Sequence, residues 1–305
     1  LGGATLGGNM AQLCDADAPG PQHVAEFLYA GSRRHLRGRP NVHDRVKAIQ
    51  SRDNPQFKAL VKLASSSRER RRAGSTIIEG EHLVRAYQAS GGIAETILAS
   101  HGAFEKPGVR ALVESAPAGS RLVLADALLE RISQLVSAAG VAAVIRTPQP
   151  GPAPRAAANC VLLEGIQDPG NLGSILRTAV AAGIRHVFLS RDSVFAWAPK
   201  VIRAGMGAHF SLSISQDADL GESARTFRGA VVAMEPRATA SLYDLDLKGP
   251  VAWVFGNEGA GLSEKIGRIA THRVRIPMPG PAESLNVAAA AAICLFEQVR
   301  QGAAA

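Results

Sequence analysis

Three loops in the second half of the chain place polar residues and glycines directly after short segments that we predict to be strands. The predicted strands are Cys160–Leu163, Val251–Phe255 and Arg273–Ile276. In an open parallel sheet, ligands bind in the crevice at the carboxyl ends of the strands. We therefore look for binding or catalytic chemistry in these three loops.

The first loop, Glu164–Asn171, is dense in glycine, proline and asparagine and leads into a predicted helix. The apolar face of this helix consists of Leu172, Ile175, Leu176, Ala179 and Val180. Gly183 ends the helix. Arg177 lies on this helix, beside the carboxyl end of the strand that precedes the loop. Its guanidinium is either a functional group or an ordinary surface charge.

The second loop, Gly256–Ser263, carries three glycines within six residues, with Glu258 among them. Glycines let the backbone approach a ligand closely and adopt positive φ. The loop is not a phosphate-binding loop, because no Gly-Lys-Ser/Thr follows it. A plain tight turn remains the alternative.

The third loop begins with the stiff segment Pro277–Pro281 and leads into an alanine-rich helix predicted from Val287 to about residue 298. Ser284 is a plausible N-cap for this helix. Asn286 falls in its predicted first turn, where helix propensity disfavours asparagine. We therefore expect a hydrogen-bonding role for Asn286, although the loop could simply be the start of a helix.

Length and composition indicate a two-domain α/β protein. At roughly 150 residues per domain, 305 residues suggest two domains. Hydrophobic residues make up 46% of the chain, yet no run of about 18 apolar residues occurs, which excludes a transmembrane helix. The three cysteines lie far apart, which excludes a disulfide framework and a CxxC zinc site. With no targeting signal visible, we expect a cytoplasmic location.

Positive charge is concentrated early in the chain. The formal net charge is +8, and residues 31–72 hold 13 basic and three acidic residues. Such a basic stretch is typical of a protein that binds a polyanion, most often a nucleic acid. A solvated basic arm is the alternative.

Composition shifts divide the chain into four parts. We expect a disordered tail over 1–44, an α/β domain over 45–146, a proline-rich linker over 147–159 and a second α/β domain over 160–303. The first domain alternates predicted helices at 54–66, 81–89, 109–115 and 126–136 with predicted strands at 76–79, 93–99, 121–124 and 141–145. The segment 67–72 is predicted to be too basic to be buried. His82 and His101 are expected at the surface rather than as metal ligands.

The three loops together resemble the motifs of one family. NLGSILRTA contains Asn171 and Arg177, FGNEGAGLS contains Gly256 and Glu258, and IPMPGPAESLNVAAAAAI runs from Ile276 past Asn286. In order and separation they look like the three motifs of the SpoU/TrmH RNA 2′-O-ribose methyltransferases of the SPOUT superfamily. The resemblance covers residues 160–303. Upstream, about residues 48–146 resemble the family's ribosomal-protein-like substrate-binding domain.

This resemblance implies a fold, a cofactor and partners. The second domain would be a trefoil-knotted α/β domain, and the first a smaller α/β RNA-binding domain. The cofactor would be S-adenosylmethionine, whose methyl group already lies on a cationic sulfur, so no metal is expected. The substrate would be RNA, with 23S rRNA favoured and tRNA as the runner-up, and the protein would be a homodimer that acts without a membrane.

Cofactor contacts are also implied by the resemblance. Backbone groups at Gly256, Ile276, Met278 and Leu285 would hold the adenosine and methionine parts of S-adenosylmethionine. Glycine and apolar residues suit this task, because they supply backbone polar groups and a slot for the adenine face.

Catalytic roles follow from the same motifs. In the family, the counterpart of Arg177 is proposed to activate the ribose hydroxyl. Because a guanidinium is hard to deprotonate, we prefer that Arg177 binds the neighbouring phosphate bidentately and stabilises the developing alkoxide. Asn171 would orient Arg177 or the ribose, and Glu258 would fix the loop or Arg177. Ser284 and Asn286 would contact substrate or a partner loop, and a structural role is the alternative for each of these four.

Two other classes of protein fit the sequence less well. A non-catalytic RNA-binding ribosome assembly factor would have lost motif residues, but Asn171, Arg177, Glu258 and Asn286 are all present. A dinucleotide-dependent enzyme would carry a glycine fingerprint after its first strand, and that fingerprint is missing.

Overall fold

The computed structural model describes residues 46–133, 139–151 and 158–303. The tail expected over residues 1–44 lies outside this part of the chain. So do the centre of the linker expected at 147–159 and the end of the helix expected to reach residue 136.

The first half of the described chain forms a five-stranded mixed sheet. The strand order is β1 (Lys47–Ile49), β4 (Arg121–Leu124), β3 (Thr96–Ser100), β5 (Val141–Arg146) and β2 (Ser75–Glu79). β5 runs antiparallel to both β3 and β2, whereas β1, β4 and β3 are parallel. Successive residues of one strand face opposite sides of a sheet, so this sheet can bury two apolar faces.

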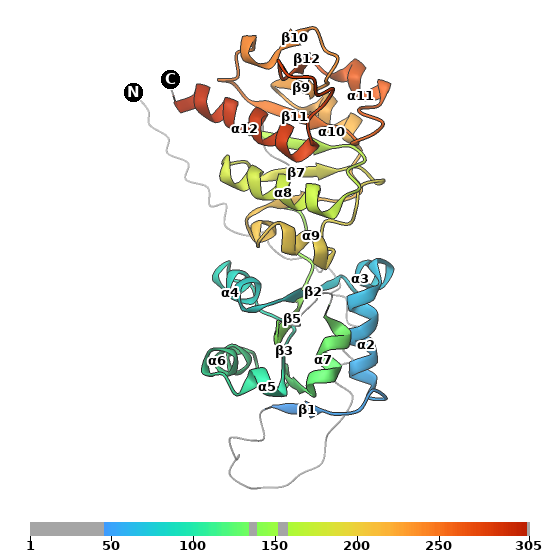
Figure 1. Ribbon diagram of the computed structural model, residues 1–305, viewed down its shortest axis with the longest axis vertical. Helices are drawn as coiled ribbons and strands as arrows, with labels where there is room; N and C mark the ends of the chain where they lie inside the picture. The colour runs from blue at the N-terminus through green and yellow to red at the C-terminus, as the bar shows by residue number, and fades with distance from the viewer. Residues whose placement is uncertain (1–45, 134–138, 152–157, 304–305) are drawn as a thin grey trace, which may run out of the picture. The chain divides into compact units, whose positions relative to one another are not determined.

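Helices cover both faces of this sheet. Figure 1 shows α2 (Pro55–Ser65) and α7 (Asp126–Ile132) on one side, with α4 (Glu81–Ala89) and α6 (Pro107–Ser115) on the other. The short helix α5 (His101–Phe104) precedes α6. Ile77 packs with residues of α2 and α7, and the adjacent Ile78 packs with residues of α4 and α6. Strands and helices alternate here as predicted.

One helix was missed because its charge argued against burial. The segment expected to be too basic for burial is helix α3 (Ser67–Ala73), and Arg70 within it is only 4% exposed. The Arg70 guanidinium donates to the carbonyl oxygens of Leu63 and Ala64, both at 2.8 Å. The last carbonyl groups of a helix lack intrahelical partners, so the end of α2 supplies the acceptors that make burial of this charge possible.

A seven-stranded parallel sheet forms the second half of the chain. The strand order is β10 (Ala240–Ser241), β12 (His272–Arg275), β9 (Ala230–Met234), β11 (Val251–Phe255), β6 (Cys160–Leu163), β7 (His186–Leu189) and β8 (Ser213–Ser215). Every pair of neighbouring strands is parallel. All carboxyl ends therefore meet at one edge, where the three loops of interest begin.

Two layers of helices bury both faces of this sheet. Val161 and Trp253 pack with residues of α8 (Pro169–Ala181) and α12 (Val287–Ala303). Their strand neighbours Leu162 and Val254 pack with residues of α10 (Leu220–Thr226) and α11 (Glu264–Ile269). The helix α9 (Pro199–Ala204) and the 3₁₀ turns Ala208–Ser211 and Leu242–Asp244 complete the fold. Burial on both faces explains why β6 and β11 are continuous apolar runs.

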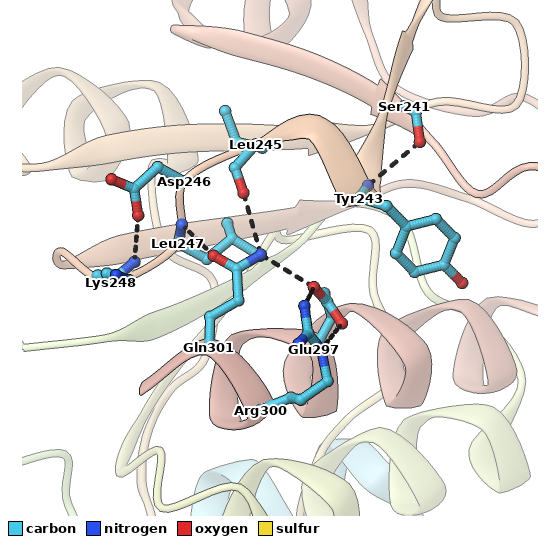
Figure 2. A network of polar contacts seen from close by, with 9 residues as sticks. All are labelled: Ser241, Tyr243, Leu245, Asp246, Leu247, Lys248, Glu297, Arg300 and Gln301. Atoms are coloured by element: carbon cyan, nitrogen blue, oxygen red, sulfur yellow. Dashed lines mark hydrogen bonds and ion pairs between the residues drawn. The ribbon is translucent and has the colours of Figure 1, made fainter. Parts of the chain in front are cut away.

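The last helix is longer than expected, because polar side chains anchor its second half (Figure 2). The Gln301 side chain accepts from the Leu247 backbone N–H at 2.9 Å and donates to the Leu245 carbonyl at 3.0 Å. Glu297 accepts from both Gln301 and Arg300. These contacts bind the end of α12 to the loop that follows the 3₁₀ turn.

Candidate functional site

The loop after β11 folds back on itself. Asn257 and Gly261 exchange two backbone hydrogen bonds, of 3.0 and 2.9 Å. The Asn257 side-chain oxygen accepts from the backbone N–H groups of Gly259 and Ala260, and Gly261 has a φ of +71°. A β-carbon at Gly256 would lie 2.5 Å from the Gly261 carbonyl carbon. The prediction that a glycine of this loop adopts positive φ is confirmed at Gly261. Gly256 lies close to the backbone of Gly261, and the expected close approach to a ligand stays a prediction.

The first two loops are joined by side chains. The Asn257 amide donates to the Gly165 carbonyl at 2.7 Å. The Glu164 carboxylate accepts from the backbone N–H and the hydroxyl of Ser263, at 2.8 and 2.7 Å. Because each contact spans more than ninety residues of sequence, these bonds fix the loop after β11 against the loop after β6.

Helix α8 begins earlier than its apolar face suggested. Asp168 is its N-cap and accepts from the Asn171 backbone N–H at 2.7 Å, and Pro169 fills the first helical position. Asn171 therefore belongs to the first turn of α8. Its side-chain amide donates to the Glu258 carboxylate at 2.8 Å.

Asn286, not Ser284, caps the last helix. The Asn286 side-chain oxygen accepts from the backbone N–H groups of Ala288 and Ala289, at 2.9 and 3.3 Å. An N-cap residue directly precedes the first helical residue, which is Val287, so the predicted cap at Ser284 is wrong. The Asn286 amide nitrogen also donates to the Asn171 side-chain oxygen at 2.8 Å, as its expected hydrogen-bonding role requires.

Asn171, Glu258 and Asn286 thus form a chain of two hydrogen bonds, which we call the polar triad. Each residue comes from a different one of the three loops. The structure brings these three predicted site residues together, and it does so through their side chains.

A cavity of about 1130 Å³ opens beside the triad. The second and third loops supply most of its wall, including the predicted site residues Gly256, Glu258, Met278, Ser284, Leu285 and Asn286. Ile276 does not line the cavity, and its side chain lies in the core. Ligand pockets usually measure about 300–1,000 Å³, so this space is large enough for a cofactor.

Arg177 lies apart from the triad. It is exposed on α8 and forms no hydrogen bond or ion pair with any residue that the structure describes. Six residues of α-helix turn through roughly 240° beyond one full turn, so Asn171 and Arg177 project in different directions. Neither Asn171 nor Glu258 holds Arg177 in this arrangement, because both are bonded within the triad.

Some charged residues that line the cavity were missed from the sequence. Glu235 directly follows β9 and accepts from the Arg273 guanidinium through both carboxylate oxygens. Arg237 and Arg268 line the same cavity. Like the three loops, Glu235 follows the carboxyl end of a parallel strand, so its position after a strand could have identified it from the sequence.

No metal site is found within the described ranges. Among those residues, no group of three or more histidine, cysteine, aspartate or glutamate side chains could hold a metal ion. Burial raises the pKa of the Cys160 and Cys294 thiols to about 12, so neither supplies a thiolate at neutral pH. No helix within the same ranges has the length and apolar character to cross a membrane.

Family models match both halves of the chain. The SpoU rRNA Methylase family matches residues 158–296, and the MRM3-like substrate binding domain matches residues 54–143. The first match spans all seven strands of the parallel sheet, and the second spans the five-stranded sheet except β1 and the end of β5.

Curated relatives align over different shares of their length. An uncharacterized tRNA/rRNA methyltransferase of Synechocystis is 35% identical over 267 residues, which cover 84% of this chain and 94% of that protein. The 23S rRNA (guanosine(2553)-2′-O)-methyltransferase RlmP of Bacillus subtilis is 30% identical over 82% of this chain and 98% of its own length. The 23S rRNA (guanosine-2′-O-)-methyltransferase RlmB of Xylella fastidiosa is 40% identical over 144 residues, only 46% of this chain and 58% of RlmB.

Solved structures share the fold. The rRNA methyltransferase of Sinorhizobium meliloti with bound S-adenosylmethionine is 29% identical and covers 84% of this chain and 98% of that chain, with a TM-score of 0.73. The SpoU methyltransferase AviRb of Streptomyces viridochromogenes, also with the cofactor, is 28% identical over 81% of this chain and 98% of that chain, with a TM-score of 0.73.

Proposed function

This chain belongs to the SpoU rRNA methylase family, and we propose that it transfers the methyl group of S-adenosylmethionine to a ribose 2′-hydroxyl of 23S rRNA. The observation that carries this proposal is the polar triad, which joins all three family motifs at the rim of one large cavity. The similarity to the Bacillus subtilis enzyme, which extends over 98% of that enzyme's length, favours ribosomal RNA as the substrate.

The cavity fits S-adenosylmethionine. Gly256, Met278 and Leu285 offer backbone polar groups and apolar surface for the adenosine, and the core residue Ile276 directly precedes the third loop and would contribute through its backbone. The carboxylates of Glu258 and Glu283 line the same space and complement a cationic sulfonium. When bound, the cofactor supplies a methyl group on positively charged sulfur, so attack by an oxygen needs no metal.

Arg177 would act on the RNA side of the reaction. Because no described residue bonds to its guanidinium, the N–H donors of Arg177 are available to a phosphate. Bidentate binding would place the ribose, and the positive charge would stabilise the ribose oxygen as its proton passes to solvent water. Asn171 and Asn286 would hold the loops, Glu258 would fix Asn171, and the exposed Ser284 would contact substrate.

The domain division remains the one expected from sequence. We assign RNA binding to residues 45–146 and catalysis to residues 160–303, with residues 147–159 as the linker. Two separate sheets and two family matches support this division. Lys47, Arg52, Lys58, Lys62 and Arg68 lie in the first of these regions and would contact phosphates without reading sequence.

A trefoil knot in the second domain is part of the same proposal. In the sheet, β9 separates β12 from β11. After β12 the chain returns across the sheet, and α12 packs on α8 beside β6. Asn286, at the end of the returning segment, contacts Asn171 on α8. A return of this kind supports the proposed knot.

We also propose that the protein is a homodimer in the cytoplasm. Phe296 and Val299 on α12 and the nearby Tyr243 are exposed, and a second copy would cover them. Light scattering at micromolar concentration should give the mass of two chains. The mass of one chain would contradict the dimer.

Radiolabelled S-adenosylmethionine and unmodified total RNA test the reaction. The wild type and Arg177→Ala would be incubated in parallel, and ribosomal and transfer RNA then separated. Label in large-subunit rRNA with the wild type alone supports the proposal. Label in tRNA alone keeps the chemistry and overturns the substrate. No label in any RNA, with the cofactor bound, favours an RNA-binding assembly factor.

A further inference from the structure

The side-chain amide of Asn171 forms hydrogen bonds to two loops that line the cavity, although Asn171 itself does not line it. Its nitrogen donates to Glu258 and its oxygen accepts from Asn286, each at 2.8 Å. Its backbone belongs to the first turn of α8, the helix that carries Arg177. We infer that Asn171 is a positioning residue that couples cofactor binding to RNA binding, so that each ligand strengthens binding of the other. This inference rests on the proposed function.

The third loop is the element that a bound cofactor would change most. Residues 279–286 are all exposed, and none of residues 279–285 forms a hydrogen bond with another described residue. At its end, Asn286 bonds to the N-terminus of α12 and to Asn171. A segment with so few contacts has a low free energy of local opening. A ligand held by Leu285 and Met278 would order it and thereby favour the bonded state of Asn286.

The first turn of α8 would respond through Asn171. When Glu258 and Asn286 are both fixed, the Asn171 amide has one position that satisfies both bonds. Arg177 lies six residues further along the same helix, about 9 Å in axial rise. Because bidentate binding of a phosphate depends on orientation, fixing the start of α8 would favour the productive direction of Arg177.

Thermodynamic linkage requires that cofactor binding and RNA binding strengthen each other by the same factor. A coupling free energy acts equally in both directions, and measured couplings commonly change affinity by about 5–150-fold. We expect S-adenosylhomocysteine, the demethylated product, to tighten RNA binding at least about fivefold. The RNA should tighten binding of S-adenosylhomocysteine by the same factor.

Direct contact between the two ligands would also give cooperativity, but it would not depend on Asn171. The affinity for the rRNA would be measured with and without saturating S-adenosylhomocysteine at one fixed salt concentration. The proteins would be the wild type, Asn171→Ala and the matched control Ser174→Ala. Ser174 is exposed on the next turn of α8, and its hydroxyl bonds to no described residue.

In the wild type and in Ser174→Ala, S-adenosylhomocysteine should increase the affinity for RNA. Asn171→Ala should bind RNA equally with and without this product. Glu258→Gln retains an oxygen that can accept from Asn171 and should retain the increase, whereas Glu258→Leu should lose it. The inference would be overturned if S-adenosylhomocysteine increased the RNA affinity of Asn171→Ala by the same factor as that of the wild type.

Hydrogen exchange gives a readout that is independent of activity. Product binding should slow exchange at residues 278–287 in both the wild type and Asn171→Ala. It should slow exchange in the first turns of α8 in the wild type alone. Equal protection of α8 in both proteins contradicts the inference.

Failure of the proposed methyltransferase activity and failure of the coupling role of Asn171 give different results. A wild type that methylates rRNA without cooperative binding removes only the role of Asn171. A wild type that binds no S-adenosylhomocysteine and transfers no methyl group removes the proposed function and this inference together.

Discussion

Gly173 of α8 lies directly against Ala204 of α9. A β-carbon at position 173 would stand 2.4 Å from the Ala204 β-carbon and 2.8 Å from the Val201 carbonyl oxygen. The two helices therefore cross at a distance that only glycine allows. This contact constrains the position of α8, the helix that carries Asn171 and Arg177.

Gly173→Ala should destabilise the protein. Overpacking of this kind costs about 1–3 kcal/mol, because backbone and not a flexible side chain must move. The free energy of unfolding from urea titration gives the measurement. Ser174→Ala, at the adjacent exposed position, should change it by less than about 0.5 kcal/mol. Equal stability of Gly173→Ala and the wild type would show that the helices separate freely.

Gly256→Ala should weaken binding of S-adenosylhomocysteine at least about tenfold, which corresponds to about 1.4 kcal/mol. The new methyl group would meet the Gly261 carbonyl at 2.5 Å, so the loop after β11 would have to open. Isothermal titration calorimetry measures the affinity. Gly280→Ala is the control, because a β-carbon there has no neighbour within 4 Å. If both variants bind as the wild type does, the loop does not shape the cavity.

Arg177→Lys should lower turnover at saturating RNA by about 100-fold, a loss typical of removing one group that stabilises developing negative charge. Lysine keeps the charge but cannot make the two parallel bonds of a guanidinium. Binding of S-adenosylhomocysteine should stay unchanged, because Arg177 does not line the cavity. Turnover near the wild-type value would remove Arg177 from the reaction, and lost cofactor binding would assign it a structural role.

Acid should destabilise the protein through His209. This side chain is buried, its Nε2 pairs with the Ala196 carbonyl at 2.9 Å, and its Nδ1 has no partner among the described residues. Burial lowers its pKa to about 4 from an ordinary value of 6.5. The unfolded chain therefore binds the proton more readily, so the stabilisation is complete above pH 6.5 and is lost as the pH falls to about 4.

Urea titrations at pH 7 and pH 4.5 measure this loss. We expect the free energy of unfolding to fall by about 2–3 kcal/mol between them in the wild type, since each pKa unit corresponds to about 1.36 kcal/mol. His209→Gln removes the titrating ring but keeps a donor for the carbonyl, so its difference should be smaller. An equal difference in both proteins would assign the acid sensitivity to other groups.

Much of the fold could be predicted from local patterns. The helix Glu81–Ala89 and the strands Arg121–Leu124, Cys160–Leu163 and Val251–Phe255 have the predicted bounds. Apolar periodicity and glycines determine these elements locally. The strand expected from residue 93 begins only at Thr96, and Ile93 is 75% exposed, so the apolar sequence extends beyond the paired strand.

The failures share a physical cause. Burial of Arg70 depends on carbonyl groups at the end of another helix, and capping by Asn286 depends on where α12 begins. The order of the seven strands and the bonds of Asn171 join residues far apart in sequence. No local pattern contains this information. The motifs identified the residues of the triad, but only the fold gives their pairing and leaves Arg177 outside it.

The polar triad also determines when the site can exist during synthesis. Its two bonds close chain segments of 87 and 115 residues. Contacts of such high sequence separation form slowly, because loop-closure entropy is lost before they contribute. Asn286 follows Asn171 by 115 residues, so Asn171 lacks this partner while most of the second domain is being made. The three loops can therefore be joined only after the segment that leads into α12 has emerged.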